Sequence, residues 1–251
     1  MDIPRNIRDG EEFSLDELKK YLSENNISAE NLSLKQFPSG YSNLTYFLQS
    51  SSKQFVLRRP PFGAKSLQGG HDMLREYNVL KNLKSQFSKV PDVFLYCDNN
   101  EILGAPFYLM ERVEGYIIRP NLQQKDSPGS DIIQNVSKSL VSTLVELHNV
   151  NIEKANLKDL GNINGYVKRQ VEGWIKRYNH SKTDNISNMD FISSWLYENQ
   201  PSEVGSSIVH NDFKYDNLVL DKDDFSKISA VLDWEMATIG DPFMDLGTTL
   251  G

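Results

Sequence analysis

The sequence is poor in cysteine, with Cys97 as its only one in 251 residues. A single cysteine excludes an internal disulfide and any zinc site built from several cysteines. Glycine and proline, at 15 and 10 residues, are too few for a collagen-like or largely disordered chain. No run approaches the roughly 18 uninterrupted apolar residues of a membrane helix, and the first residues lack the apolar segment of a secretory signal. We therefore expect a protein of the reducing cytoplasm that does not enter a membrane.

Positive charge is also scarce, because 27 basic and 34 acidic side chains leave a formal net charge of −7. A general nucleic-acid-binding protein normally carries a basic face, so this balance argues against that class. It does not exclude one local site for a polyanion, where a metal ion can neutralise phosphate charge. Apolar residues make up 39% of the chain, which is enough for a substantial core in one large domain or two lobes.

The first half of the chain predicts a small antiparallel sheet with one helix packed on it. Ser14 and Glu17 have the spacing of a capping box at the start of a helix. Three strand-like runs follow. The third ends at two prolines, which cannot continue a strand ladder. A second helix and a further apolar run complete this half. The expected elements cover residues 13–25, 32–37, 44–48, 55–59, 73–87 and 107–113.

After Gly115 the apolar residues recur at helical spacing. Two short strands near the end flank a charged turn. The expected helices lie around residues 132–147, 166–178 and 192–196, and the strands at 218–220 and 229–232. Trp174, on the second of these helices, is expected to pack in the core. We predict an α+β fold with an N-terminal lobe over residues 1–113 and a mainly helical C-terminal lobe over residues 114–251.

The strongest chemical signal is the stretch IVHNDFKYDNLVL, followed by ISAVLDWE. His210, Asp212 and Asn217 have the spacing H-x-D-x-x-x-x-N, and Asp233 follows across a predicted hairpin. Phosphoryl transfer needs a carboxylate that accepts the proton of the attacking hydroxyl, and oxygen ligands that hold Mg²⁺ against a triphosphate. Asp212 is the candidate base, and Asn217 and Asp233 are the candidate magnesium ligands. Each residue alone is more often a turn residue, but four at this spacing favour the chemistry.

These motifs, with GDPFMDL after them, resemble the aminoglycoside-phosphotransferase-like small-molecule kinases. Within that group the chain is most similar to the kinase-like domain fused to some acyl-CoA dehydrogenases. The segments FPSGYSNLTY, FVLRRPP and REYNVLKNL resemble earlier parts of the same group in the same order, so the resemblance covers about residues 14–251. It implies a bilobal protein-kinase-like fold and an ATP- and Mg²⁺-dependent transfer of phosphate to a hydroxyl of a small molecule. Because that family normally continues through further helices, a C-terminal lobe truncated at Gly251 is also an expectation.

The resemblance implies a set of ATP-binding residues in the N-terminal lobe. Backbone N–H groups of the turn with Gly40, Ser42 and Asn43 would bind the phosphates, although Gly40 would serve any tight turn. Arg58 stands at the position of the kinase lysine on the third strand, and Glu76 from the following helix would be its partner. Arginine keeps its charge and can bind phosphate through two N–H groups.

The neighbouring strand residue gives a further expectation. Since side chains alternate along a strand, only one of Arg58 and Arg59 should face inward.

Further roles follow from the same resemblance. Backbone groups of Glu111 and Val113 would bind the adenine, with Met110 at the back wall of the pocket. His210 would brace the catalytic loop. Two acids of GDPFMDL, Asp241 and Asp245, would tie that loop to later helices. The remaining histidines, His71, His148 and His180, do not have the spacing of metal ligands.

Alternatives to this kinase remain open. Arg58 at the lysine position also fits a nucleotide-binding module without catalysis, and a metal-dependent phosphate hydrolase also uses His and Asp near a hairpin. The acceptor is open as well. An acidic surface suits an aminoglycoside, whereas the dehydrogenase resemblance favours a hydroxylated acyl thioester or another metabolite. The sequence gives no indication of an oligomeric state.

Overall fold

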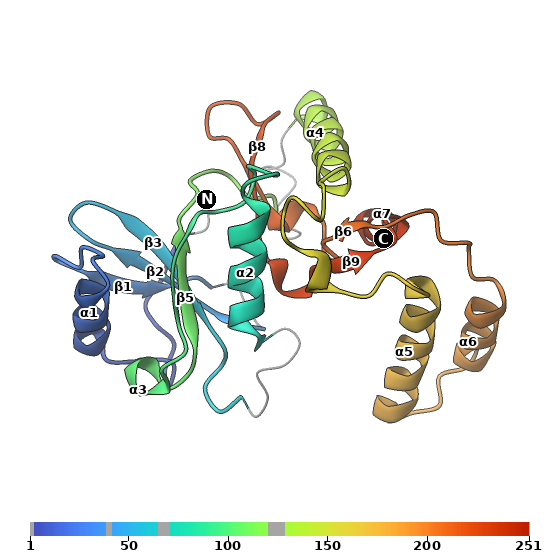
Figure 1. Cartoon of the computed structure of the whole chain (residues 1–251), viewed down its shortest axis with the longest axis horizontal. Coiled ribbons are helices and arrows are strands. Elements are labelled where there is room, and N and C mark those ends of the chain that lie inside the picture. Colours follow the sequence, from blue (N-terminus) through green and yellow to red (C-terminus); the bar gives the residue numbers. More distant parts are fainter. Residues whose placement is uncertain (1–2, 39–41, 65–70, 120–128, 251) are drawn as a thin grey trace.

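The structure is a computed structural model that describes residues 3–38, 42–64, 71–119 and 129–250. A five-stranded sheet with three helices forms one end of the molecule, and the remaining helices and two small sheets form the other (Figure 1). The predicted α+β class with two lobes is confirmed. Within the described ranges, no helix has the length and apolar character needed to cross a membrane.

The large sheet is antiparallel throughout and has the strand order β1-β2-β3-β5-β4. Its strands are β1 (Ser33–Gln36), β2 (Leu44–Gln49), β3 (Gln54–Arg59), β4 (Val93–Cys97) and β5 (Phe107–Glu111). The helices beside it are α1 (Leu15–Glu24), α2 (Met73–Leu83) and the short α3 (Asn100–Leu103). The first two helices begin at side-chain caps, since Ser14 Oγ accepts from Glu17 N at 3.3 Å and Asp72 Oδ1 accepts from Arg75 N at 2.9 Å.

Both faces of the large sheet are covered, where the sequence predicted one helix on it. Leu18 and Leu22 of α1 pack with Leu57 of β3 on one face, and Leu80 of α2 packs with Val56 on the other. This arrangement changes the expectation for the two strand arginines. Arg58 and Arg59 do point to opposite faces, but each face is covered, so both are buried. Arg59 donates to the carbonyl oxygens of Pro60 and Leu103.

The second half of the chain carries the predicted helices and hairpin. Its helices are α4 (Ser130–His148), α5 (Tyr166–Ser181), α6 (Met189–Glu198) and α7 (Phe243–Leu250), with short 3-10 turns η3 (Lys158–Leu160), η4 (Tyr215–Asn217) and η5 (Trp234–Met236). Strands β7 (Leu218–Leu220) and β8 (Ile228–Val231) pair as the expected hairpin, and β6 (Ser207–Val209) pairs with β9 (Thr238–Gly240).

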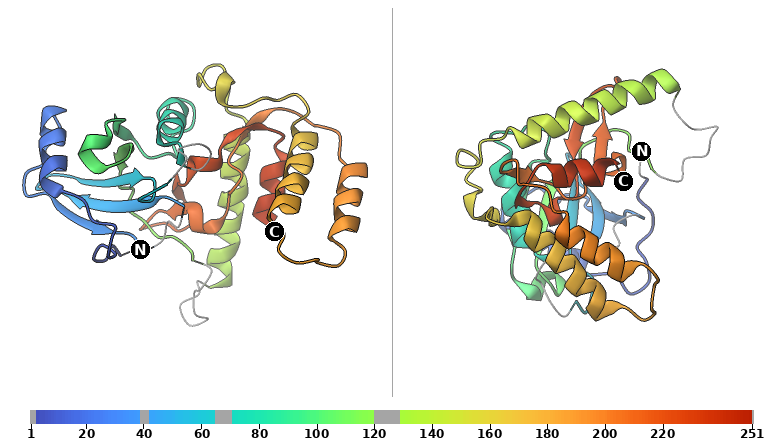
Figure 2. Two further views of the ribbon diagram at one scale, coloured as in Figure 1. Left: turned by 90° about the horizontal axis from the view of Figure 1, so that it is seen from below. Right: turned by 90° about the vertical axis from the view of Figure 1, so that its right-hand side faces the viewer.

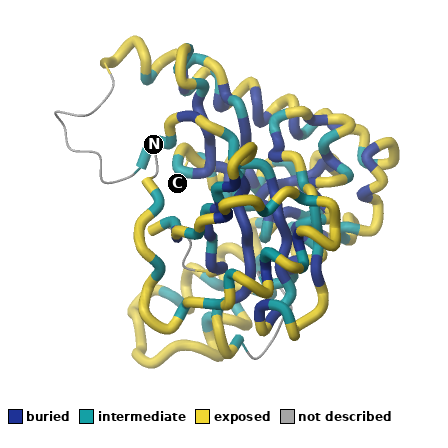
Figure 3. The backbone as a smooth tube through the Cα atoms, turned by 90° about the vertical axis from the view of Figure 1, so that its left-hand side faces the viewer, coloured by how far each residue is buried: buried dark blue, intermediate teal, exposed yellow. Residues whose placement is uncertain are grey.

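One hydrophobic cluster joins α2 and β5 to α4, the β7–β8 hairpin and η5, so the two ends of the molecule share a core. Figure 3 shows these buried stretches gathered inside and the exposed ones outside. Helices α5 and α6 lie side by side at the end remote from the large sheet (Figure 2). The prediction that Trp174 packs in the core is wrong. Its side chain is 57% exposed, and the Arg177 guanidinium lies 4.1 Å from its ring.

Gly115 lies where the chain leaves β5 and passes β7. Tyr116 N donates to Leu220 O at 2.9 Å, and Leu220 N donates to Tyr116 O at 2.8 Å. A Cβ atom at Gly115 would fall on the Leu220 carbonyl oxygen and within 2.6 Å of Val219 Cγ1. The two backbones can therefore pair at this distance only because residue 115 has no side chain.

Gly115→Ala is expected to lower the free energy of unfolding by about 1–3 kcal/mol, because the added methyl group forces these backbones apart. Urea denaturation followed by circular dichroism measures the change. Gly205→Ala is the matched control, since a Cβ there meets no atom within 4 Å. Equal midpoints for the two variants would show that the close approach at Gly115 does not matter for stability.

Candidate active site

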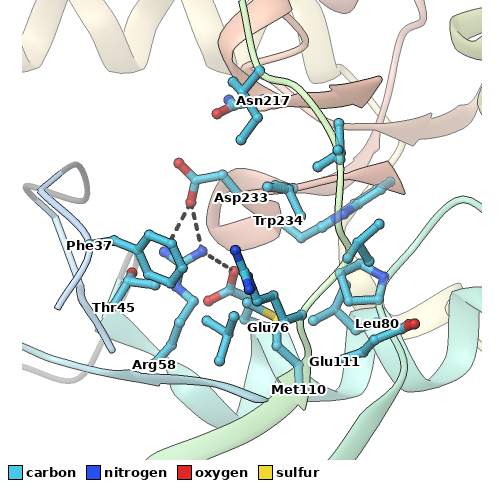
Figure 4. Close-up of a pocket in the computed structure, with 18 of the residues that line it drawn as sticks. Phe37, Thr45, Arg58, Glu76, Leu80, Met110, Glu111, Asn217, Asp233 and Trp234 are labelled. Carbon is cyan, nitrogen blue, oxygen red and sulfur yellow. Dashed lines mark hydrogen bonds and ion pairs between the residues drawn. The ribbon is translucent and has the colours of Figure 1, made fainter. Parts of the chain in front are cut away.

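A pocket of about 180 Å³ lies between the large sheet and the β7–β8 hairpin. It brings together seven of the residues predicted from the sequence, namely Arg58, Glu76, Met110, Glu111, Val113, Asn217 and Asp233. Figure 4 shows Asp233 between Asn217 and Arg58. Asp212 does not line this pocket but hydrogen-bonds Asn217, which does. Gly40 lies outside the described residues.

Arg58 faces three carboxylates from two other elements. Its Nη1 lies 2.8 Å from Glu76 Oε1 on α2, and both Nη atoms lie 3.0 Å from Asp233 Oδ1. Its Nη2 also lies 3.2 Å from Glu235 Oε2 on η5. Burial opposes the charge of Arg58, but the carboxylates, Glu76 foremost, hold its pKa well above the usual value. The guanidinium therefore stays charged and joins β3, α2 and η5.

The three carboxylates differ in how easily they lose their proton. Burial raises the pKa of Glu76 to about 7 despite the opposing charge of Arg58. Burial and the charge of Asp233 raise the pKa of Glu235. Although burial opposes it, the nearby Arg58 keeps the pKa of Asp233 below its usual value. Asp233 is thus the carboxylate that carries negative charge most readily.

Glu235 also holds the segment before β2. Asn43 Nδ2 donates to Glu235 Oε2 at 2.7 Å, and His71 Nδ1 lies 3.0 Å from Asn43 Oδ1. A hydrogen bond from Ser42 adds to this group, because it is among the contacts that lower the pKa of Glu235. The predicted phosphate-binding residues Ser42 and Asn43 therefore meet Arg58 through one carboxylate.

Asp212 lies on a loop between β6 and η4, where two side chains fix its carboxylate. Asn217 Nδ2 donates to Asp212 Oδ2 at 2.8 Å and to its carbonyl oxygen at 2.9 Å. Lys214 Nζ lies 2.9 Å from Asp212 Oδ1, and this hydrogen bond raises the pKa of Lys214. A carboxylate held by an amide and an ammonium group has a defined orientation, which a general base requires.

His210 and Asp245 hold the same loop through hydrogen bonds to its backbone. His210 Nε2 lies 2.9 Å from Leu232 O, which can only accept, so Nε2 carries the proton. Nδ1 can then accept from Asp212 N at 3.3 Å. Burial lowers the pKa of His210, which favours this neutral form. Asp245 accepts from the backbone N–H groups of His210 at 2.7 Å and Asn211 at 2.6 Å.

Asp241, the other acid of the GDPFMDL segment, hydrogen-bonds a different part of the chain. Its Oδ2 accepts from Val204 N at 2.7 Å and its Oδ1 from Phe243 N at 2.9 Å, so it fixes the start of α7.

The residues predicted to bind magnesium suit that ion in their chemistry. Asn217 gives its amide nitrogen to Asp212, which leaves its oxygen as the donor atom for a cation, and Asp233 adds a carboxylate. Such hard oxygen donors match Mg²⁺. In the part of the chain that the structure describes, no group of three or more His, Cys, Asp or Glu side chains has an arrangement that could hold a metal ion. The two predicted ligands therefore stay a prediction.

Sequence reasoning gave no role to several residues of this site. Glu235 stands in the LDWE segment and Lys214 in the HNDFKYDN segment, so their positions within motifs were the available signal. His148, which lacks the spacing of a metal ligand in the sequence, has its Nε2 3.0 Å from Asp245 Oδ2. Asn211, between His210 and Asp212, carries contacts that no local pattern indicates.

The fold is that of a protein-kinase-like phosphotransferase. It has a sheet lobe and a helical lobe, a pocket between them, and an aspartate on a loop held by hydrogen bonds. A solved protein from Ralstonia eutropha, provisionally described as an aminoglycoside phosphotransferase, shares this fold with a TM-score of 0.79. It is 29% identical, and the match covers 95% of this chain and 69% of that one. An aminoglycoside phosphotransferase solved with GDP and kanamycin is similar in fold, at a TM-score of 0.68 and 18% identity, over 92% of this chain and 76% of that one.

The chain belongs to the phosphotransferase enzyme family, whose sequence model matches residues 33–251. Acyl-CoA dehydrogenase family member 11 of Rattus norvegicus is 42% identical over 216 residues, which cover 86% of this chain. The same match covers 27% of that relative, so the chain spans about a quarter of its length. The resemblance to the kinase-like domain of such dehydrogenases is confirmed.

Glu76 should make the stability of the fold depend on pH. Its pKa is about 7 in the folded chain against 4.5 when solvated, so the folded state binds the proton more tightly. This contribution to stability is complete below about pH 4.5 and is lost as the pH rises through 7. Glu76→Gln should remove that part of the slope of unfolding free energy against pH, measured by urea denaturation from pH 5 to about 8.

Glu198→Gln, at the exposed end of α6, is the control for a lost carboxylate and should keep the wild-type slope. A wild-type slope in Glu76→Gln would mean that Glu76 is ionised throughout this range.

Proposed function

We propose that the protein transfers the γ-phosphate of ATP, with Mg²⁺, to a hydroxyl group of a small molecule. The observation that carries this proposal is the Asp212–Asn217 pair, joined at 2.8 Å beside a pocket that Arg58 and Asp233 also line. A base, an amide oxygen, a carboxylate and a fixed cation are the parts that in-line phosphoryl transfer uses. Membership in a phosphotransferase family supports the same reaction.

In this proposal Asp212 orients the acceptor hydroxyl and takes its proton as the oxygen attacks phosphorus. Asn217 and Lys214 hold the carboxylate in one orientation, which limits the loss of alignment during the reaction. Arg58 binds phosphate oxygens through its guanidinium. Asn217 and Asp233 would hold Mg²⁺, which neutralises phosphate charge when it is bound.

The pocket walls suit a nucleotide base. Apolar side chains from both ends of the molecule line it, including Phe37, Val56, Met110, Val219 and Leu232. We assign the adenine ring of the nucleotide to this part of the pocket, with backbone groups of Glu111 and Val113 at its edge. Support comes from solved proteins of similar fold that bind GDP with kanamycin, or ADP with hygromycin B. We propose ATP as the donor.

The acceptor, the location and the domain limits belong to the same proposal. The similar solved proteins bind aminoglycosides, and the longer relatives are described as acyl-CoA dehydrogenases. We therefore propose a hydroxylated small molecule as the partner and no nucleic acid.

We also propose that the protein is cytoplasmic. Its single cysteine, Cys97, is free and buried, as is usual in a reducing compartment. We place the lobe boundary between residues 113 and 114.

A nucleotide-binding module without catalysis is the second candidate. The observation that favours it is the engagement of Arg58 by Glu76, Asp233 and Glu235, because a phosphate must compete with these carboxylates for the guanidinium. This candidate predicts binding of Mg-ATP without a phosphorylated product. A phosphate hydrolase would instead release phosphate without an acceptor.

Asp212→Asn should lower turnover by roughly 100- to 10,000-fold, because the amide cannot accept the proton of the acceptor. The acceptor is first found by screening a panel of hydroxylated metabolites, aminoglycosides and acyl thioesters for ADP release. Calorimetry with Mg-ATP should give the wild-type affinity, since Asp212 does not line the nucleotide pocket.

Asp223→Asn, on the exposed turn between β7 and β8, is the control and should keep full turnover. Wild-type turnover in Asp212→Asn would contradict the assigned base. Mg-ATP binding by the wild-type chain, without product from any acceptor of the panel, would favour the non-catalytic module.

A further inference from the structure

Asn211, one residue before the proposed base, has an unusual backbone conformation. Its φ angle is +64°, in the left-handed region that residues other than glycine rarely adopt and that asparagine tolerates best. Its backbone N–H donates to Asp245 Oδ1 at 2.6 Å. The direction in which the chain enters Asp212 depends on this conformation, since a rotation at residue 211 swings the next residue.

The side chain of Asn211 joins two other parts of the fold. Its Nδ2 donates at 3.0 Å to the carbonyl oxygen of Met236, the last residue of η5. Because that carbonyl can only accept, the amide orientation is fixed and Oδ1 is left to accept. Tyr166 OH, from the first residue of α5, donates to Oδ1 at 3.2 Å. Asn211 is thus held by α5, by the end of η5 and, through its backbone, by α7.

Tyr166 reaches the loop because β9 leaves room for its ring. The tyrosine is 3% exposed. A Cβ atom at Gly240 would lie 2.5 Å from the ring, so the ring packs directly on the backbone of β9. The packing leaves the hydroxyl one defined position, at Asn211.

We propose that Asn211 and Tyr166 form a positioning pair that holds the backbone at Asp212 and so couples helix α5 to the catalytic loop. This inference rests on the proposed phosphotransferase function. Asn217 and Lys214 fix the Asp212 carboxylate from the residues that follow it. The pair fixes the chain from the residue that precedes it. A misplacement of about 1 Å can cost two orders of magnitude in rate, so loss of this anchor should lower turnover.

Tyr166→Phe removes one hydroxyl group and leaves the packed ring in place. It should lower kcat by roughly 10- to 100-fold and leave the KM for ATP unchanged, because Tyr166 does not line the nucleotide pocket. Tyr178→Phe, a tyrosine of the same helix remote from the loop, is the control and should behave as wild type. Asn211→Gly keeps the positive φ accessible but removes the amide. It should lower kcat as well, and the double variant should be no slower than Asn211→Gly alone.

Hydrogen–deuterium exchange of the whole 251-residue chain gives a readout that does not need an acceptor. In Tyr166→Phe, the amides of residues 209–213 should exchange faster, while those of β2 and β3 keep their wild-type rates. Rates equal to wild type at 209–213 would overturn the proposal. Faster exchange there with wild-type kcat would also overturn it, because the contact would then be structural only.

Hydrogen–deuterium exchange tests the positioning pair separately from the proposed phosphotransferase activity. If the wild-type chain transfers no phosphate to any acceptor or to water, the phosphotransferase assignment fails. Local exchange at 209–213 in Tyr166→Phe against Tyr178→Phe still decides whether the pair holds the loop. Faster exchange across the whole chain would overturn the pair as a local anchor.

Discussion

The charge of Arg58 is the constraint on which the rest of the site depends. A buried guanidinium must be paired, and here it is paired with Glu76 of α2 and with Asp233 and Glu235 beyond the β7–β8 hairpin. These contacts cross the pocket, so they set the distance between the sheet and the hairpin. Burial raises the pKa values of Glu76 and Glu235, whereas Arg58 keeps the pKa of Asp233 below its usual value, so Asp233 holds the negative charge most readily. A polyphosphate that enters the pocket would meet the Arg58 guanidinium in a fixed position, but it would compete with the three carboxylates for it.

The loop that carries Asp212 is held by hydrogen bonds to its backbone and not by paired charges. Asp245 and His210 are buried and bind backbone groups, so the loop is fixed by hydrogen bonds that a change of its surface side chains would leave intact. Asn211 is the exception, because its side chain hydrogen-bonds Tyr166 of α5 and Met236 at the end of η5. A loop built in this way fixes the position of Asp212 while its carboxylate stays partly exposed to solvent.

Much of the fold could be predicted because its signals are local. The capping residue Ser14, the alternation along β2 and the helical spacing in α2 and α4 each act over a few residues. The motif from His210 to Asn217 and the position of Asp233 gave the candidate site, since a hairpin returns the chain to the same place. The burial of Arg59 was not predicted, because alternation assigns faces but does not say what covers them.

The sequence by itself determined the fold class, the helices and strands that have a clear local pattern, and the residues in the phosphotransferase motif, because short-range periodicity and spacing carry that information. The tertiary structure alone decided that Glu235 shares Arg58 with Asp233, that Tyr166 meets Asn211 and that His148 reaches Asp245. These partners are 177, 45 and 97 residues apart for Arg58–Glu235, Tyr166–Asn211 and His148–Asp245. A contact across such a separation leaves no period in the chain, and it forms only when packing brings the two side chains together.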